Sequence, residues 1–194
     1  MVALAFLAAL VAVQAFSAKP AEAGVCLYCG SGGGNVTPIN LGGATTVPAN
    51  DNFSAAQGVA QQPTSFLAWF TGNTTLATLE AGEPKPYSAV KDCGVYGISN
   101  SGISNSVWFK FTPRFTGQIQ ASTYGSSFDT VLGLYKGSSL TSLQQVSCSN
   151  DNSSNWTESM TAGIAAGQTY YLQLSGTGGL RSGAYKLGVA GGTN

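Results

Sequence analysis

The chain has 194 residues, with eight cationic side chains, eight anionic side chains and no histidine. Charged residues make up 8% of it, whereas an ordinary soluble domain carries roughly 25%. Without histidine there is no Ser-His-Asp triad, no Cys-His pair and no imidazole metal site. So few scattered cations argue against a nucleic-acid partner. Hydrophobic residues make up 43% of the chain, which is enough to form a core, so disorder driven by high charge is excluded.

The N-terminus has the pattern of a targeting sequence. Residues 1–16 are apolar except for Gln14, and they lead to the small-x-small sequence Ala21-Glu22-Ala23. This pattern is typical of a secretory signal peptide cleaved after Ala23. The apolar run is shorter than the roughly 20 residues that a spanning helix needs. Because no Lys or Arg precedes the run, a retained apolar helix over residues 1–23 is the alternative. We therefore expect a secreted or cell-surface protein whose mature chain does not span the membrane.

Residues 24–49 are rich in Gly, Thr and Pro and predict a flexible tail. The folded domain is expected over residues 50–194. Four cysteines are present, and in an exported chain disulfides are the default. The most economical of the three connectivities joins Cys93 to Cys148 within the domain and Cys26 to Cys29 in the tail. Intermolecular links through the tail cysteines, which would join subunits, are the alternative.

Short apolar runs follow one another along the domain, separated by clusters of Gly, Ser and Asn. Their period-2 alternation and their β-branched and aromatic residues predict strands. These runs cover residues 65–70, 74–78, 106–111, 117–122, 130–135, 143–148, 157–164, 168–174 and 184–189. Residues 53–62 are interpreted as a further strand rather than a helical turn. The prediction is an all-β, antiparallel β-sandwich of about eight or nine strands with jelly-roll-type connections.

The alternation also predicts which side chains face the core. In residues 106–111 Trp108 and Lys110 lie on the face opposite the core, where we expect Trp108 to be packed between structural layers. The side chains predicted to point inward from three strands are Val107, Phe109, Phe111, Tyr170, Leu172, Leu174, Tyr185, Leu187 and Val189.

A series of short phrases runs through residues 50–189: NDNFSAAQ, ATLEAGEP, SVWFKFTP, TYGSSFDTVLGLYKGSSLTSL, SNDN, AGQTYYLQLSG and GAYKLGV. Together they resemble the bacterial pre-peptidase C-terminal domain family and its close relatives. The resemblance implies a β-sandwich of about eight strands that is non-catalytic and serves binding, adhesion or secretion. Two departures are the Asn152 that stands where relatives often have a second Asp, and the longer loop between Pro84 and Ser106.

The few carboxylates fall largely inside these phrases. Calcium takes six to eight oxygen ligands, and Glu80, Asp129, Asn150 and Asp151 are candidate ligands if their loops meet. The sequence favours the simpler interpretation, that Asp129 and Asp151 cap turns through their own backbone, and the calcium site is the alternative. A pair of these groups acting as a glycosidase acid and base is not favoured, because nothing else in the sequence indicates a sugar cleft. We therefore expect no catalytic residues.

Aromatic side chains offer another kind of site, because sugar rings stack on exposed indole and phenol groups. Trp156 lies in a polar turn, and Tyr87 and Tyr96 lie in the long loop. These three are the candidate ligand-binding residues, and Trp69 is ambiguous. Two functions are compatible with this sequence. One is an exported, non-catalytic module that binds extracellular polysaccharide or a surface protein. The other is a self-assembling subunit of an extracellular filament or surface layer that uses the N-terminal tail for joining.

Overall fold

The computed structural model describes residues 45–86, 93, 102–150, 156–177 and 181–193. The signal segment 1–23 and most of the tail 24–49 lie outside the described residues. So do Cys26, Cys29, Tyr87, Tyr96 and Asp151. The interpretations that rest on them remain predictions.

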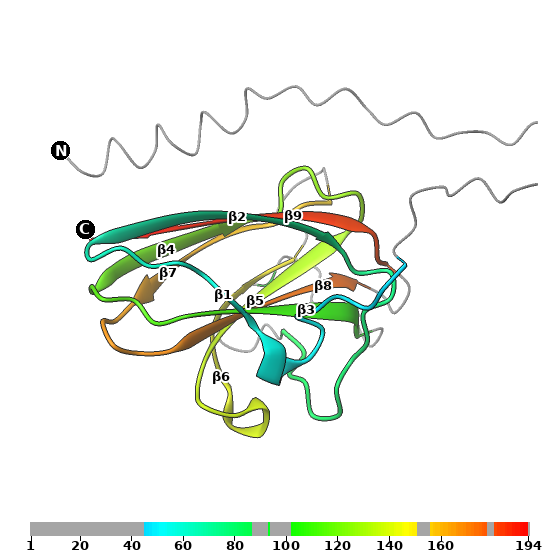
Figure 1. Ribbon diagram of the computed structural model, residues 1–194, viewed down its shortest axis with the longest axis horizontal. Helices are drawn as coiled ribbons and strands as arrows, with labels where there is room; N and C mark the ends of the chain where they lie inside the picture. Colours follow the sequence, from blue (N-terminus) through cyan, green and yellow to red (C-terminus); the bar gives the residue numbers. More distant parts are fainter. Residues whose placement is uncertain (1–44, 87–92, 94–101, 151–155, 178–180, 194) are drawn as a thin grey trace, which may run out of the picture. The chain divides into compact units, whose positions relative to one another are not determined.

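Nine strands in the described part of the chain form two sheets that lie one above the other (Figure 1). The five-stranded sheet has the order β1 (Gln57–Gly58), β3 (Ile103–Phe111), β8 (Tyr170–Thr177), β5 (Thr130–Lys136) and β6 (Gln144–Ser149). The four-stranded sheet has the order β2 (Ser65–Asn73), β9 (Ala184–Gly192), β4 (Gly117–Ser122) and β7 (Ser159–Ile164). All neighbours are antiparallel except β1 and β3. The predicted all-β sandwich is confirmed.

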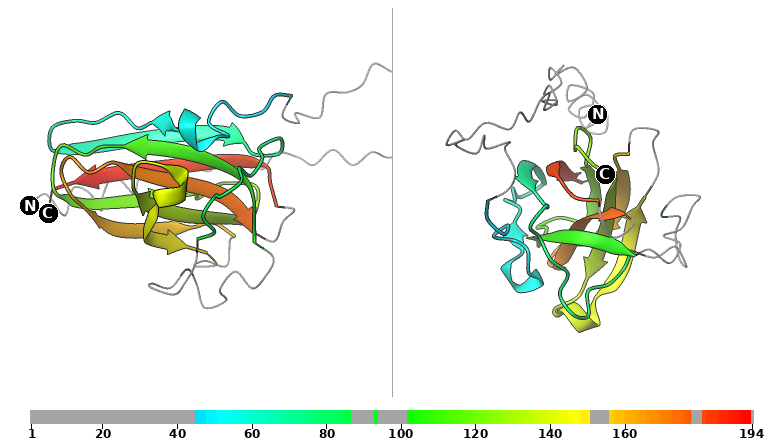
Figure 2. Two further views of the ribbon diagram at one scale, coloured as in Figure 1. Left: turned by 90° about the horizontal axis from the view of Figure 1, so that it is seen from below. Right: turned by 90° about the vertical axis from the view of Figure 1, so that its right-hand side faces the viewer.

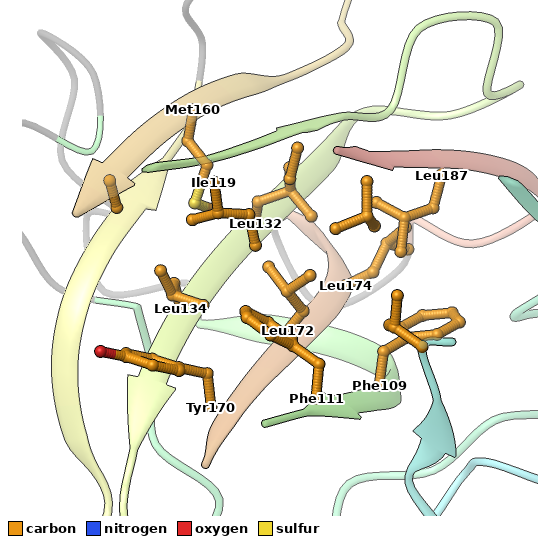
Figure 3. Close-up of a cluster of buried hydrophobic side chains, with 14 of the residues drawn as sticks. Phe109, Phe111, Ile119, Leu132, Leu134, Met160, Tyr170, Leu172, Leu174 and Leu187 are labelled. Carbon is orange, nitrogen blue, oxygen red and sulfur yellow. The ribbon is translucent and has the colours of Figure 1, made fainter. Parts of the chain in front are cut away.

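The core lies between the sheets, as the alternation requires. Ile119 and Met160 of the four-stranded sheet face Leu132, Leu172 and other side chains of the five-stranded sheet (Figure 3). Each large apolar side chain that is fully buried contributes about 1.5–3 kcal/mol. All nine side chains predicted to point inward from β3, β8 and β9 are buried in this cluster.

Two local predictions differ from the structure. Residues 74–78, predicted as a strand, form a turn in which the Ala77 N–H donates to the Thr74 carbonyl over 2.9 Å. The β-branched composition favours a strand, but the amide and hydroxyl of Thr78 donate instead to the carboxylate of Asp51 over 2.6 and 2.8 Å. Residues 53–62 are predicted to form a strand rather than a helical turn. They contain both: the 3₁₀ turn η2 (Phe53–Ala55) and the two-residue strand β1.

A further layer covers the outer face of the five-stranded sheet. Figure 1 shows η2 and the segment after β2 below that sheet, and Figure 2 shows the cyan segment before β2 along one side of the sandwich. The Phe53 ring packs edge-on against Trp108, with the ring centroids 5.3 Å apart, and against Tyr171 at 4.3 Å. Trp108 is fully buried, so its predicted place between layers is confirmed.

The predicted Cys93–Cys148 disulfide is present, and it joins the long loop to β6. The two Cα atoms are 5.1 Å apart, and both cysteines are buried. The bond closes a sequence separation of 55 residues, for which the chain-entropy model gives roughly 4 kcal/mol of stabilisation.

Candidate functional site

The outer face of the five-stranded sheet, which we call the covered face, is organised around Glu83. Its carboxylate accepts hydrogen bonds from Ser106 Oγ at 2.6 Å and Gln173 Nε2 at 2.9 Å, and Trp108 Nε1 lies 3.4 Å away. Ser106, Trp108 and Gln173 are fully buried. Since a buried donor left without an acceptor costs about 1–3 kcal/mol, Glu83 stabilises the layer that covers this sheet. Its role is structural.

Tyr135 completes the covered face. Its hydroxyl donates to Gln173 Oε1 over 3.1 Å, and its ring packs 6.1 Å from that of Trp108. Burial first, and then the negative charge of Glu83, raise the pKa of Tyr135 well above its ordinary value. The phenol therefore stays protonated at physiological pH, as a hydrogen-bond donor inside the protein rather than a group that exchanges protons with a ligand.

The four predicted calcium ligands are not all at one place. Asp129 precedes β5 and Asn150 follows β6, and these strands pair at that end, with Leu132 opposite Ser149. Glu80, by contrast, accepts a hydrogen bond from the backbone N–H of Phe53 in the layer over β3 and β8. No group of three or more His, Cys, Asp or Glu side chains among the described residues is placed to hold a metal ion. The calcium site predicted at Glu80, Asp129, Asn150 and Asp151 stays a prediction, because Asp151 lies outside the described residues.

Trp156 lies at the same end of the sandwich as Asp129. Its side chain is 56% exposed, its backbone is left-handed (φ 60°), and its carbonyl accepts the Thr130 N–H over 3.1 Å. The Arg181 guanidinium lies over the indole, 5.1 Å from the ring centroid, and Arg181 Nε is 3.8 Å from Asp129 Oδ2. Arg181 thus links an exposed aromatic ring to a buried carboxylate. Since one side of the Trp156 ring already contacts a cation, less of it is available for a ligand.

The outer face of the four-stranded sheet, which we call the open face, carries a different tryptophan. Leu67 and Trp69 point outward from β2 and are 57% and 50% exposed. Trp69 pairs with Gly188 of β9, and a Cβ added to Gly188 would lie 2.5 Å from Trp69 Cζ3. The indole therefore lies directly on the Gly188 backbone, which leaves its other side to solvent.

Polar, uncharged side chains continue across the open face. The strand register places Leu67 in a row with Ala190, Gln120 and Thr161, and Trp69 in a row with Gly188, Ser122 and Ser159. Lys186, opposite Thr71, is the one charged residue on this face among β2, β9, β4 and β7. The open face thus combines one flat aromatic surface with amide and hydroxyl groups.

From the sequence alone, Trp69 is ambiguous between a core position and an exposed one. The signal that would have placed it is the alternation in SFLAWFTGN, because Phe66, Ala68 and Phe70 pack against the core and Leu67 and Trp69 must then point away. The alternation does not indicate whether a further layer of the protein covers the outward side chains. Trp108 is on the outer side of its strand too, and it is buried.

The fold and these faces define an all-β sandwich with one covered and one open outer face. No protein-family model matches the chain, and no curated protein matches it. Among solved structures, the chain is similar to PliG of Aeromonas hydrophila, a periplasmic lysozyme inhibitor of g-type lysozyme. The identity is 10% over 70% of this chain and 95% of that chain, with a TM-score of 0.40.

A second similar structure is the GH26-CBM35 β-(1,4)-mannanase of Podospora anserina. Here the identity is 14% over 69% of this chain and 29% of that chain, with a TM-score of 0.28. Neither similarity carries a functional argument. No helix in the described ranges is both long and apolar enough to cross a membrane.

Proposed function

We propose that this protein is an exported, non-catalytic module that binds a neutral extracellular polysaccharide through its open face. The observation that carries the proposal is the half-exposed Trp69 ring lying on Gly188. An exposed indole is a favourable surface for the apolar face of a sugar ring. The outward tryptophan of the other sheet, Trp108, is by contrast fully buried.

The side chains around Trp69 support a polyhydroxylated ligand. Gln120, Ser122 and Thr161 carry amide and hydroxyl groups that both donate and accept hydrogen bonds, as sugar hydroxyls do. They come from two neighbouring strands and extend from Trp69 across the sheet. A ligand with many charges would leave its charges unpaired on this face, because Lys186 is the one charged group there. A neutral polymer fits it better.

The family interpretation of the sequence agrees with this proposal, because a pre-peptidase C-terminal-like module is expected to bind without catalysis. The targeting sequence supports export. Calcium at Glu80, Asp129, Asn150 and Asp151 is a separate expectation, checked by thermal unfolding with and without a chelator. A melting temperature that the chelator leaves unchanged would speak against it.

The test compares two exposed tryptophans. Wild-type protein is incubated with a panel of insoluble polysaccharides (cellulose, chitin, mannan and xylan), and the bound fraction is measured after sedimentation. Trp69→Ala is expected to lower retention about tenfold or more, while the matched change Trp156→Ala, at a residue of similar exposure, leaves most of it. Leu79→Ala, at an exposed leucine in the layer over the other sheet, controls for general loss of surface hydrophobicity.

Two results would reject the proposal. If Trp156→Ala abolishes retention and Trp69→Ala does not, the ligand binds at the end of the sandwich, as the sequence predicted. If wild-type protein is not retained by any polysaccharide of the panel, the open face has another role. Circular dichroism of each variant confirms that the fold is intact before retention is compared.

A further inference from the structure

Strand β2 is an edge strand with a long, regular free side. It pairs with β9 over all nine residues, from Ser65 opposite Gly192 to Asn73 opposite Ala184, with no register shift. No other strand in the described part of the chain pairs with its opposite side. In an antiparallel ladder alternate residues direct their backbone N–H and C=O groups away from the neighbour. β2 therefore presents a row of backbone donors and acceptors to another strand.

The protections that proteins usually give to such an edge are missing from β2. Residues 65–73, SFLAWFTGN, contain no charged residue and no proline, and Leu67 and Trp69 are exposed on them. The other edge strands differ. β1 has two residues, β6 has a register shift against β5 and is joined to Cys93, and β7 has six residues. The outward side chains of β7 are the small Ser159, Thr161 and Gly163.

We propose that β2 pairs antiparallel with β2 of a second copy of this chain, around a two-fold axis at Trp69. Trp69 is the middle residue of Ser65–Asn73, so this register centres the pairing on both strands. At the start of the strand the Ser65 carbonyl already accepts the Gln62 N–H over 3.0 Å, so the pairing is carried by the residues that follow it. The register places Trp69 opposite Trp69 of the second copy and Leu67 opposite Thr71 of the second copy. Aromatic pairs and apolar–β-branched pairs are favourable cross-strand neighbours, and a two-fold contact is self-complementary by construction.

Charge favours a second copy as the occupant. Neither partner brings a charged residue into the paired strands, and the chain has a formal net charge of zero, so two copies do not repel each other at long range. Pairing would join two four-stranded sheets into one, with both open faces on the same side. Two Trp69 rings would then lie next to each other. The pairing goes beyond the proposed function, since it is measured without any ligand.

The test introduces charged residues at positions that the proposed β2–β2 register places opposite each other. In Leu67→Lys/Thr71→Lys, the proposed pairing sets Lys against Lys at two symmetric positions. In Leu67→Glu/Thr71→Lys, it sets Glu against Lys at the same two positions, and the Thr71→Lys change opposite Lys186 is common to both variants. Like charges directly opposite each other destabilise a strand pair and opposite charges stabilise it. Sedimentation velocity of the full chain over a range of concentrations should show a dimer for the wild type. The Lys/Lys variant should dissociate about tenfold or more readily than the Glu/Lys variant.

The control is Thr161→Lys, which adds a charge to the outer side of β7 and should leave the dimer unchanged. Hydrogen–deuterium exchange at low and high concentration measures the edge directly: the outward amides of β2, which are not bonded to β9, should become protected as the dimer forms. A chain that is monomeric throughout overturns the proposal. So does equal dissociation of the two double variants. Protection of the outward amides of β2 that is independent of concentration also overturns it, because a segment of the same chain would then pair with the free side of β2.

Discussion

The two outer faces of the sandwich each carry a tryptophan, and the two tryptophans differ in exposure to solvent. Trp108 on β3 and Trp69 on β2 both point away from the core, yet Trp108 is fully buried and Trp69 is half exposed. Over Trp108 the chain supplies Phe53 and Glu83, and at the other edge of the same sheet the disulfide joins Cys93 to β6. Over Trp69 the described residues supply no such layer. The position of a side chain on its strand therefore decides only whether it faces the core, and the loops decide whether it meets water.

Because of this difference in burial, we expect the covered face to contribute to stability and the open face to contribute to ligand binding. A covered face contributes to the free energy of unfolding, because removing its side chains leaves cavities and unpaired donors. An exposed aromatic ring contributes little to stability, and exposed apolar side chains gathered on one face, as Leu67 and Trp69 are, mark an interaction surface. Substitutions on the two faces should therefore separate a loss of stability from a loss of binding.

The largest difference in stability is expected between the variants Trp108→Ala and Trp69→Ala. Truncation of the buried indole should lower the free energy of unfolding by about 3–5 kcal/mol, because it empties the space between Phe53 and Tyr135. Truncation of the exposed indole should lower it by less than about 1 kcal/mol. Urea unfolding followed by circular dichroism measures both. Equal losses for the two variants would mean that Trp69 is packed as firmly as Trp108.

The disulfide provides the next largest effect. Replacing Cys93 and Cys148 together by Ala should lower the free energy of unfolding by about 2–4 kcal/mol, because the unfolded chain regains the freedom of a loop of 55 residues. Polysaccharide retention through the open face should change little at temperatures where the variant is folded. If retention falls while the fold is intact, the loop held by Cys93 takes part in binding, and the two faces are not independent.

The fold was predictable because its main signal is local. Alternation in β3, β8 and β9 placed their inward residues correctly, since a period of two must put one set of side chains on the buried face. The same rule failed at residues 74–78, where β-branched residues suggested a strand. There Asp51, far away in the sequence, accepts the hydrogen bonds that a neighbouring strand would have taken. Such a partner has no sequence signal that alternation can detect.

The candidate site was less predictable, and for the same physical reason. Glu80 was grouped with Asp129 because both lie in phrases of the family resemblance, but Glu80 accepts the Phe53 N–H on the covered face. Trp156 was selected because it lies in a polar turn, and it is indeed exposed, but Arg181 lies over its ring. The exposure of Trp69 depends on where segments distant in the sequence pack, which is information that only the structure supplies.

Alkaline pH should destabilise the covered face. Burial and the charge of Glu83 raise the pKa of Tyr135 in the folded protein above its ordinary value of 10.0. The unfolded chain therefore loses its phenol proton first as the pH rises. The contribution of this group to the free energy of unfolding is fully present below about pH 10 and then falls by about 1.4 kcal/mol per pH unit.

Tyr135→Phe should reduce the decrease in the free energy of unfolding that urea unfolding measures between pH 8 and 11. Part of it should remain, because burial also raises the pKa of Tyr185. An unchanged slope would show that Tyr135 ionises in the fold.

Adding one methyl group at Gly188 tests whether binding depends on the placement of the Trp69 ring on the open face. A methyl group in Gly188→Ala would lie 2.5 Å from Trp69 Cζ3, so the ring must move off the β9 backbone. The cost in stability should stay below about 1 kcal/mol, because an exposed side chain can move into solvent. Polysaccharide retention should nevertheless fall several-fold, since the ring is no longer held flat beside Gln120 and Ser122.

Gly163→Ala is the matched control for this change. Gly163 is also on the outer side of the four-stranded sheet, and a Cβ there would meet no atom within 4 Å. It changes the same residue type on the same face without touching Trp69. Retention that falls equally in both variants would mean that any added methyl group disturbs the face. Retention that falls only in Gly188→Ala ties binding to the placement of one ring, which is the property that distinguishes the open face from the covered one.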